Sequence, residues 1–233
     1  AIIGACQPKL LSYAHRREFE YAGGSGGWLD TFGYPFSRGR IFDIVEEDNG
    51  QYNDAVPCFW ASGAAMFVKA DLYHSIGGLD EYFFAHQEEI DFCWRMQLAG
   101  YKVYVQPASV VYHVGGGTLN KINPKKTYFN FRNNLITLVK NSDSKFLFFK
   151  VIYRMILDGV AAYKFLFEGN GVHLIAVAKA HFAFYFSLPA TLKKRSIMKH
   201  KKGFAYTNSS IFQDNIVYLH FIKGVKKYSD LKL

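Results

Sequence analysis

The pattern of apolar residues changes at Pro124, and this change limits what the chain can fold into. Beyond Pro124, apolar residues recur at helical spacing through three long segments, with breaks near Ser142 and at 168–171. Before Pro124, short apolar runs alternate with clusters of glycine, tyrosine and turn-forming residues. The sequence therefore predicts an α/β part followed by a helical C-terminal extension. The three expected helices are residues 125–141, 144–167 and 171–195.

The expected α/β part combines short strands, one long irregular stretch and one clear helix. Residues 86–99 have apolar side chains at helical spacing, and Gly100 ends the pattern. Residues 12–56 are rich in glycine and turn formers, so we expect a mostly irregular excursion of a kind that is usually functional or mobile. The other expected elements are a strand over 1–7 that ends at Pro8, strands on either side of 63–65, a short helix from Asp71, and strands over 101–107 and 109–114.

The charges divide the chain in a similar way. Residues 1–120 contain 8 Lys and Arg against 14 Asp and Glu, whereas residues 121–233 contain 20 against 5. The net charge of +9 therefore combines an acidic first half with a strongly basic second half. A basic run can also bind nucleic acid, but no recognition motif accompanies this one, so we expect no nucleic-acid partner.

The long apolar segments of the basic half do not predict a membrane span, because charged residues such as Lys179 interrupt them. Lys150, Arg154 and Asp158 are spaced by four residues and share one face of their expected helix. Two interpretations stay open. The helix lies on an anionic membrane with its basic side chains toward lipid, or it covers the core of the first part. The basic cluster at 192–203 slightly favours the membrane.

Composition and cysteine usage bound the class of protein. Half of the residues are hydrophobic and 18% are aromatic, which allows a sizeable core and excludes a disordered chain. The three cysteines, Cys6, Cys58 and Cys93, are an odd number, and no two have the spacing of zinc ligands. We therefore expect buried thiols in a reducing compartment rather than a disulfide framework.

Three carboxylates crowd the start of the expected helix at 86–99. Glu88, Asp91 and Arg95 share one helix face, whereas Glu89 is turned about 100° away, toward Cys93. In a structural interpretation, the acids favour the positive end of the helix dipole and Asp91 pairs with Arg95 at i+4. In a functional interpretation, the clustered acids hold a proton-accepting base, because like charges raise one another's pKa.

A histidine and a glycine run follow the last expected strand of the α/β part. His113 ends an apolar segment and precedes 115–118, which reads Gly-Gly-Gly-Thr. Successive glycines let backbone N–H groups approach a phosphate closely, and the threonine hydroxyl adds a donor. An imidazole at the same edge can ligate a divalent metal that carries the phosphate. The glycine run alone is weak evidence, because it lacks the ending of a P-loop.

Together these motifs bring the sequence close to a known family. The segment "SGAAMFVKADLYHSIGGLDEYFFAHQEEIDFCWRMQLAGYKVYVQPASVVYHVGGGT" strongly resembles the C-terminal half of the catalytic domain of family 2 glycosyltransferases, in the rhamnosyltransferase-like branch. The resemblance covers about residues 57–141, including "YFNFRNNL". It implies an α/β sandwich of the GT-A type that transfers a sugar from a nucleotide donor with inversion. It also implies a divalent cation, Mn²⁺ or Mg²⁺, that neutralises the departing diphosphate.

The resemblance also implies roles for particular residues. The family's acidic pair falls on Glu88 and Glu89; its second member is usually Asp and usually the base. Because Glu89 is one methylene longer, the base stays open between Glu89, Glu88 and Asp91. His113 matches the histidine that in related enzymes lies beside the metal or the diphosphate, and it is the expected metal ligand. The expected donor and diphosphate contacts are Trp60, Ser62, Gly63, Arg95, Gly116, Gly117 and Thr118.

The family pattern also suggests how the chain is organised. The nucleotide-binding half, which ends in an Asp-x-Asp-type metal motif, should precede the segment at 7–11, so we expect about a hundred residues before this sequence. Acids at 46–48 have a similar spacing, but a solvated loop or an acceptor contact is the stronger interpretation. The expected parts are an acceptor-side half of a GT-A domain at 1–124, a basic amphipathic helical extension at 125–202 and a Lys/Tyr-rich tail at 203–233.

The sequence thus predicts an inverting glycosyltransferase of surface polysaccharide synthesis, of which this chain by itself is an incomplete and inactive part. Its expected partners are a nucleotide-sugar donor, a saccharide or lipid-linked acceptor and an anionic membrane surface. Its expected location is cytoplasmic, peripheral on the inner face of the bacterial cytoplasmic membrane. The alternative is a non-catalytic membrane- or partner-binding module, suggested by the basic, aromatic second half.

Overall fold

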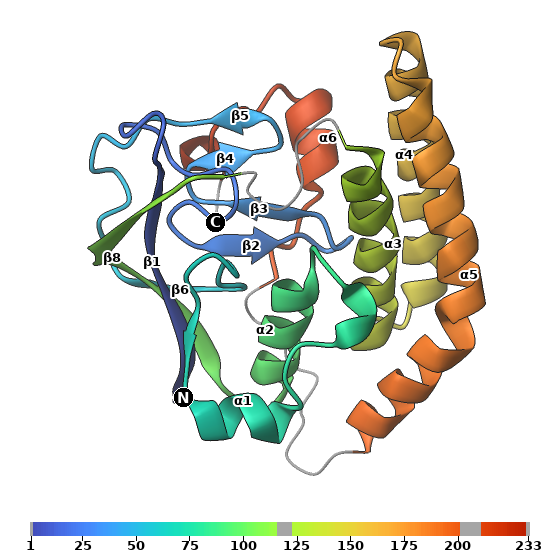
Figure 1. Cartoon of the computed structure of the whole chain (residues 1–233), viewed down its shortest axis with the longest axis horizontal. Helices are drawn as coiled ribbons and strands as arrows, with labels where there is room; N and C mark the ends of the chain where they lie inside the picture. The colour runs from blue at the N-terminus through green and yellow to red at the C-terminus, as the bar shows by residue number, and fades with distance from the viewer. Residues whose placement is uncertain (1, 116–122, 201–210, 232–233) are drawn as a thin grey trace.

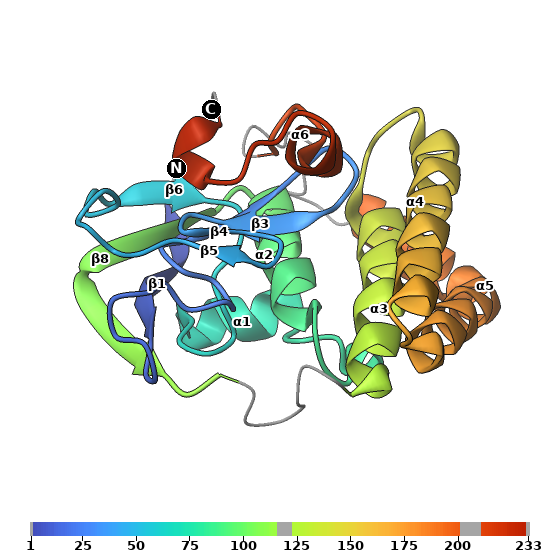
Figure 2. The same cartoon turned by 90° about the horizontal axis from the view of Figure 1, so that it is seen from above.

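The computed structural model describes residues 2–115, 123–200 and 211–231. Within them the protein is a mixed α/β structure followed by long helices, as the sequence predicts. In both views the two sheets occupy one side of the molecule and the long helices the other, with α2 (Glu88–Leu98) between them (Figure 1 and Figure 2).

The main sheet has the strand order β6-β8-β1-β7. Strands β1 and β8 are parallel, so their carboxyl ends, Ser12 and His113, pair at the same edge. The antiparallel strands β6 and β7 complete the sheet. The bounds are β1 Ile3–Ser12, β6 Val56–Cys58, β7 Phe67–Val68 and β8 Lys102–His113.

Two expectations about these strands were wrong. Strand β1 does not end at Pro8, because the register shifts between Pro8 and Lys9, and such an irregularity tolerates a residue without an N–H. The two strands expected at 101–107 and 109–114 are one strand, β8, which continues through the same irregularity to His113.

The stretch at 12–56 is more regular than predicted. It contains a second, antiparallel sheet in which the strand order β2-β3-β4-β5 follows the chain. Strands of two or three residues are too short to show a period of two, which explains the error. The bounds are β2 Gly27–Leu29, β3 Pro35–Ser37, β4 Arg40–Ile41 and β5 Ile44–Val45.

Helix α2 lies at the centre of the main hydrophobic core. It is buried on nearly every face, and its Trp94 ring meets the Phe59 ring edge-on. The predicted helix at 86–99 is thereby confirmed, with its start two residues later. Two short helices precede it: α1 Ala70–Ile76 and the 3₁₀ helix η1 Glu81–Phe83.

The three long helices form a separate layer and confirm the expected segments, although the last one extends further. Helix α3 stands between α2 and the outer helices (Figure 1), and its apolar side chains pack against Phe83 and Phe184. Asn123 caps α3 by accepting a hydrogen bond from the Lys125 N–H, and Pro124 occupies the first turn. The bounds are α3 Pro124–Asn141, α4 Leu147–Phe167 and α5 Gly171–Lys199.

The orientation of helix α4 contradicts one of the two interpretations made from the sequence, in which its basic side chains face an anionic membrane. Its polar face turns inward: Lys150 donates to the Thr31 carbonyl, and Arg154 pairs with Asp158 and donates to the Phe32 carbonyl. The outward face is apolar, and Phe167 is 86% exposed. Lys150 and Arg154 therefore face protein rather than anionic lipid.

Helix α5 bears on the expectation that no segment spans a membrane, and it does not overturn that expectation. Among the described residues it is the one helix that is long and apolar enough to cross a bilayer by length and composition, despite Lys179. A core helix of a soluble protein meets the same criterion, so this property alone does not indicate a span.

The described part of the tail returns to the second sheet. Phe212 pairs with Asp30, whose carboxylate accepts a hydrogen bond from the Ile216 N–H. Phe212, Ile216 and Tyr228 complete a second core with residues of the second sheet. The tail contains helix α6 Ile216–Phe221 and the 3₁₀ helix η2 Tyr228–Asp230.

Candidate active site

A strained loop leads into the first turn of α2. Phe84, His86 and Gln87 have positive φ angles of 64°, 67° and 75°, a region that residues with a side chain rarely adopt. Each such residue costs on the order of 1–3 kcal/mol, so the surroundings must hold it in place. Strain of this kind gathers at functional sites more often than elsewhere in proteins.

Helix α3 supplies the groups that hold this loop. The Asn133 amide donates to the carbonyl oxygens of Phe83, Ala85 and His86 at 3.0, 2.8 and 2.7 Å. Arg132 donates to the Tyr82 and Phe83 carbonyls and to the Asn133 side-chain oxygen. The "FRNN" part of the resemblance therefore positions the loop before α2, a role that the sequence had not assigned.

Glu88 and Glu89 stand at the end of this loop. Both side chains are partly exposed, yet Oε2 of each is buried and has no hydrogen-bond partner within the described part of the chain. Burial, and then the charge of Glu88, raises the pKa of Glu89 to about 7, while backbone N–H groups at the helix start lower it by less. Burial also raises the pKa of Glu88.

His86, two residues before Glu88, is a further polar group of the strained loop that sequence reasoning missed. Burial, and then the charge of Lys126, lowers the pKa of His86 to about 4, so its imidazole is neutral near pH 7. Its Nε2 is buried and accepts or donates no hydrogen bond among the described residues. The loop and the first turn of α2 thus carry two carboxyls and a neutral imidazole, each with a buried atom that has no hydrogen-bond partner among the described residues.

The segment Ala61–Gly63 forms the opposite wall of this site. A Cβ added to Gly63 would lie 3.9 Å from the Glu89 Cβ, so the two residues face each other. The Ala61 N–H donates to Cys93 Sγ, one turn beyond Glu89. Gln7 fixes the next peptide by accepting from the Ser62 N–H at 2.7 Å. The structure thus brings Gly63, one of the expected donor contacts, next to Glu89, with Ser62 preceding it in the same segment.

Trp60 supports this wall from behind. Its indole N–H donates to the Trp28 carbonyl at 2.9 Å, and only 4% of the residue is exposed. A Cβ on Gly27 would fall 2.0 Å from the indole ring, so only glycine fits there. This packing does not support the expected donor contact for Trp60.

Asp91 and Arg95 occupy a different environment from the glutamates. Asp91 is completely buried and accepts from Arg95 Nε at 2.8 Å, Lys140 Nζ at 2.9 Å and Asn141 Nδ2 at 2.8 Å. Arg95 also donates to the Ile76 and Gly78 carbonyls. The i+4 pair predicted from spacing is therefore present, while neither side chain is free to act as a base or to bind diphosphate.

His113 lies at the carboxyl end of β8 with Glu20 beside it. The two side chains approach to 3.4 Å between His113 Nδ1 and Glu20 Oε1, without a hydrogen bond. Glu20 is buried, and no sequence motif singles it out. An imidazole nitrogen and a carboxylate oxygen suit Mn²⁺ or Mg²⁺ as partial ligands. Among the described residues, no three His, Cys, Asp or Glu side chains gather into a metal-binding group.

Two further expectations can be placed or set aside. Of the acids at 46–48, Glu46 is buried against Tyr52 and Tyr228, Asp48 pairs with Lys9, and Glu47 is exposed, so only Glu47 is solvated as a loop residue would be. The cysteines are free, with Cys58 and Cys93 buried and Cys6 partly buried. Gly116, Gly117 and Thr118 lie outside the described residues.

An α/β fold with an acidic helix start at a strained loop fits an enzyme site, and sequence similarity indicates the kind of enzyme. No family model matches the chain. Over 63 residues it is 35% identical to an N-acetylglucosaminyl-diphospho-decaprenol L-rhamnosyltransferase of Mycobacterium tuberculosis, covering 27% of this chain and 20% of that protein. Over 62 residues it is 34% identical to the rhamnosyltransferase WbbL of Escherichia coli, covering 27% and 23%.

These similarities relate part of the chain to glycosyltransferases. The matched segment spans only about a fifth of the length of these curated relatives, 20% and 23%. The relationship is therefore established at the level of glycosyltransferases and over about a quarter of this chain, 27%.

Proposed function

We propose that this chain is the acceptor-side part of an inverting family 2 glycosyltransferase of the GT-A type, and that Glu89 is its catalytic base. The observation that carries the proposal is the Glu89 carboxyl itself. Its residue stands at the end of a strained loop with its Cβ opposite Gly63, one carboxyl oxygen is buried without a partner among the described residues, and the pKa of the carboxyl is about 7. A base whose pKa lies near the working pH accepts a proton most effectively.

The proposed reaction is a single displacement. Glu89 accepts the proton of an acceptor hydroxyl as that oxygen attacks the anomeric carbon of the donor sugar. The bond between the anomeric carbon and the nucleoside diphosphate breaks, and the configuration inverts. His113 and Glu20 would hold part of the coordination sphere of a divalent cation, which supplies neutralisation of the leaving diphosphate. Glu88 keeps the pKa of Glu89 high through its charge.

The substrate class follows from the relatives and belongs to the same proposal. One relative is named for a diphospho-decaprenol acceptor and both kinds for rhamnosyl transfer. We infer a nucleotide-sugar donor and a lipid-linked acceptor in surface polysaccharide synthesis. An enzyme with such an acceptor works at the cytoplasmic face of the membrane. The exposed apolar side chains of α4 and α5, among them Phe148, Phe167 and Phe186, support peripheral membrane association.

The test is the turnover of the complete protein with a panel of sugar nucleotides, Mn²⁺ and a lipid-linked acceptor. Glu89→Gln is expected to lower kcat by about 10²–10⁴-fold while donor binding stays nearly unchanged, because only proton transfer is lost. Glu81→Gln, at an exposed position of η1 just before the loop, is the matched control and should retain full turnover. Unchanged turnover of Glu89→Gln excludes Glu89 as the base.

A second candidate function is a non-catalytic membrane-binding module. The exposed apolar face of α4, with Ile156 and Val160 both more than half exposed, favours it. Co-sedimentation with phosphatidylglycerol vesicles distinguishes this function. If the chain is such a module, Ile156→Asp should weaken vesicle binding, whereas Glu89→Gln should bind vesicles as the parent protein does. Absence of vesicle binding would remove this candidate.

A further inference from the structure

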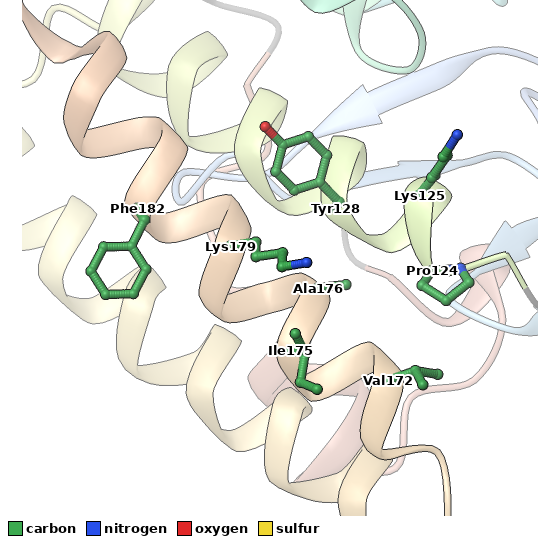
Figure 3. A pocket seen from close by; sticks show the side chains of 8 residues that line it. All are labelled: Pro124, Lys125, Tyr128, Val172, Ile175, Ala176, Lys179 and Phe182. Carbon is green, nitrogen blue, oxygen red and sulfur yellow. The ribbon is translucent and has the colours of Figure 1, made fainter.

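A groove of about 490 Å³ lies between the start of α3 and the first half of α5, apart from the carboxylate site. Figure 3 shows its two walls. The α5 wall is mostly apolar, with Val172, Ile175, Ala176 and Phe182. Most of these side chains are exposed, Phe182 by 65%, so the groove is an open apolar surface rather than closed core. Its volume is in the range of about 300–1,000 Å³ that is usual for ligand pockets.

The polar groups of the groove have one sign of charge. Lys125 and Lys179 line it together with Tyr128, and among the described residues no acidic side chain does. Figure 3 shows the lysines on different walls, one on α3 and one on α5. An apolar channel with two ammonium groups and one hydroxyl matches a ligand that has an anionic end and a hydrocarbon chain.

The groove is built on a fixed part of the helical layer. Thr127 and the buried His173 form a hydrogen bond of 2.7 Å, which ties the first turn of α3 to the first turn of α5. The ring of His173 also contacts Phe165 of α4. The two walls are therefore held at a set separation before any ligand binds, which reduces the entropy cost of binding.

The same turns of α3 connect the groove with the carboxylate site. Tyr128 accepts a hydrogen bond from Arg132, which in turn holds the Tyr82 carbonyl before the strained loop. Phe129, the next residue, stacks on Phe84 within that loop, with ring centroids 5.3 Å apart. The start of α3 thus lines the groove with one face and supports the strained loop before α2 with a neighbouring face.

We infer that this groove binds the prenyl chain and phosphate end of a lipid-linked acceptor whose sugar reaches Glu89. The inference rests on the proposed function and adds a binding site for the part of the acceptor that does not react. Lys125 and Lys179 pair with the anionic end, and Ile175 and Phe182 contact the first isoprene units. Binding energy from this remote part would hold the acceptor in place for the chemical step.

Binding is tested on the 233-residue chain by isothermal titration with farnesyl diphosphate, farnesol and inorganic pyrophosphate. Farnesyl diphosphate is expected to bind at least tenfold more tightly than either of the others, because it engages both the apolar wall and the lysines. Equal affinity for pyrophosphate would overturn the inference, since the apolar wall would then contribute nothing.

Matched variants locate the binding. Ile175→Asp, or Lys125→Glu with Lys179→Glu, should weaken farnesyl diphosphate binding by about tenfold or more. Ile197→Asp and Lys193→Glu are controls on the same helix outside the groove; Ile197 is 62% exposed, against 53% for Ile175. Equal loss in the groove variants and their controls would indicate a general membrane surface and overturn the inference. Vesicles of phosphatidylglycerol form a separate arm, in which the groove variants should behave like their controls.

The two proposals fail separately. Glu89→Gln should bind farnesyl diphosphate normally while losing turnover. In the complete protein, Ile175→Asp should raise KM for a prenyl-linked acceptor without changing KM for a short soluble saccharide. If the groove variants bind farnesyl diphosphate normally and Glu89→Gln is inactive, only the groove proposal is overturned. If the groove variants lose binding and Glu89→Gln keeps its turnover, only the assignment of Glu89 is overturned.

Discussion

Asp91 and Glu89 are carboxylates on the same helix, but they differ in burial and in their hydrogen-bond partners. Asp91 is completely buried and has three partners, two of them cationic. Glu89, two residues earlier, is partly exposed and has a buried oxygen without a hydrogen-bond partner in the described part of the chain. The cations beside Asp91 balance its buried charge and so stabilise the fold. Burial, and then the charge of Glu88, instead raises the pKa of Glu89 to about 7, so this carboxyl can exchange its proton near neutral pH.

Helix α3 creates this difference. Its last turn sends Lys140 and Asn141 to Asp91, and Lys140 also pairs with Asp80. From its middle, Arg132 and Asn133 donate hydrogen bonds to backbone carbonyls of the strained loop, and within the described residues neither pairs with Glu88 or Glu89. The same helix therefore neutralises one acid and positions the others without neutralising them.

The largest effect is expected where the buried charges are balanced. Asp91→Asn leaves Arg95 and Lys140 buried with one negative charge fewer, so we expect the free energy of unfolding to fall by about 3–5 kcal/mol. Urea denaturation at pH 7 measures it, with Glu81→Gln as the control. A loss below about 1 kcal/mol would show that the Asp91 network does not hold α2 and α3 together.

A smaller loss of stability is expected from the clamp on the strained loop. Asn133→Ala removes three hydrogen bonds to backbone carbonyls, and the free energy of unfolding should fall by about 2–3 kcal/mol. Its neighbour Asn134, whose Oδ1 has no hydrogen-bond partner among the described residues, is the matched control. If Asn134→Ala destabilises as much, the three bonds are not what holds the loop.

The pH dependence of stability reports on the raised pKa of Glu89. Because the pKa of Glu89 is raised in the folded state from 4.5 to about 7, the folded protein binds more protons between these values. Ionising Glu89 thus destabilises the fold as pH rises through this window, and the cost is complete above pH 7. The stability of Glu89→Gln relative to the parent should therefore be greater at pH 8 than at pH 5, by roughly 1–2 kcal/mol. Thermal unfolding at both pH values measures it, and a constant difference contradicts the raised pKa.

The smallest effect is expected at an ion pair that shares the i+4 spacing of Asp91 and Arg95 but lies in solvent. Lys164 and Glu168 approach to 3.7 Å, and their side chains are 59% and 49% exposed. Glu168→Gln should change the free energy of unfolding by less than about 0.5 kcal/mol, because water and salt screen the pair. Urea denaturation at low and high salt checks it. A change comparable to Asp91→Asn would break the comparison between buried and exposed pairs.

Local spacing predicted much of the fold. Helix α2 and the three long helices follow from periodicity, and the pair of Asp91 and Arg95 follows from its i+4 spacing. The short strands of the second sheet were missed, because two or three residues give no period and their pairing depends on distant chain segments. The direction of α4 was also left open, since a helix with apolar and polar faces does not say which one meets the protein.

The candidate site shows the same division between what the sequence predicts and what the tertiary structure decides. The sequence by itself placed Glu88, Glu89 and His113 as functional candidates, because residue type and order along the chain are local properties. Only the tertiary structure decided that Asp91 is neutralised by α3, that Glu20 stands beside His113, and that Gly63 faces Glu89. The physical reason is that a carboxyl's reactivity depends on its burial and on the charges around it, and those come from segments far away in the chain.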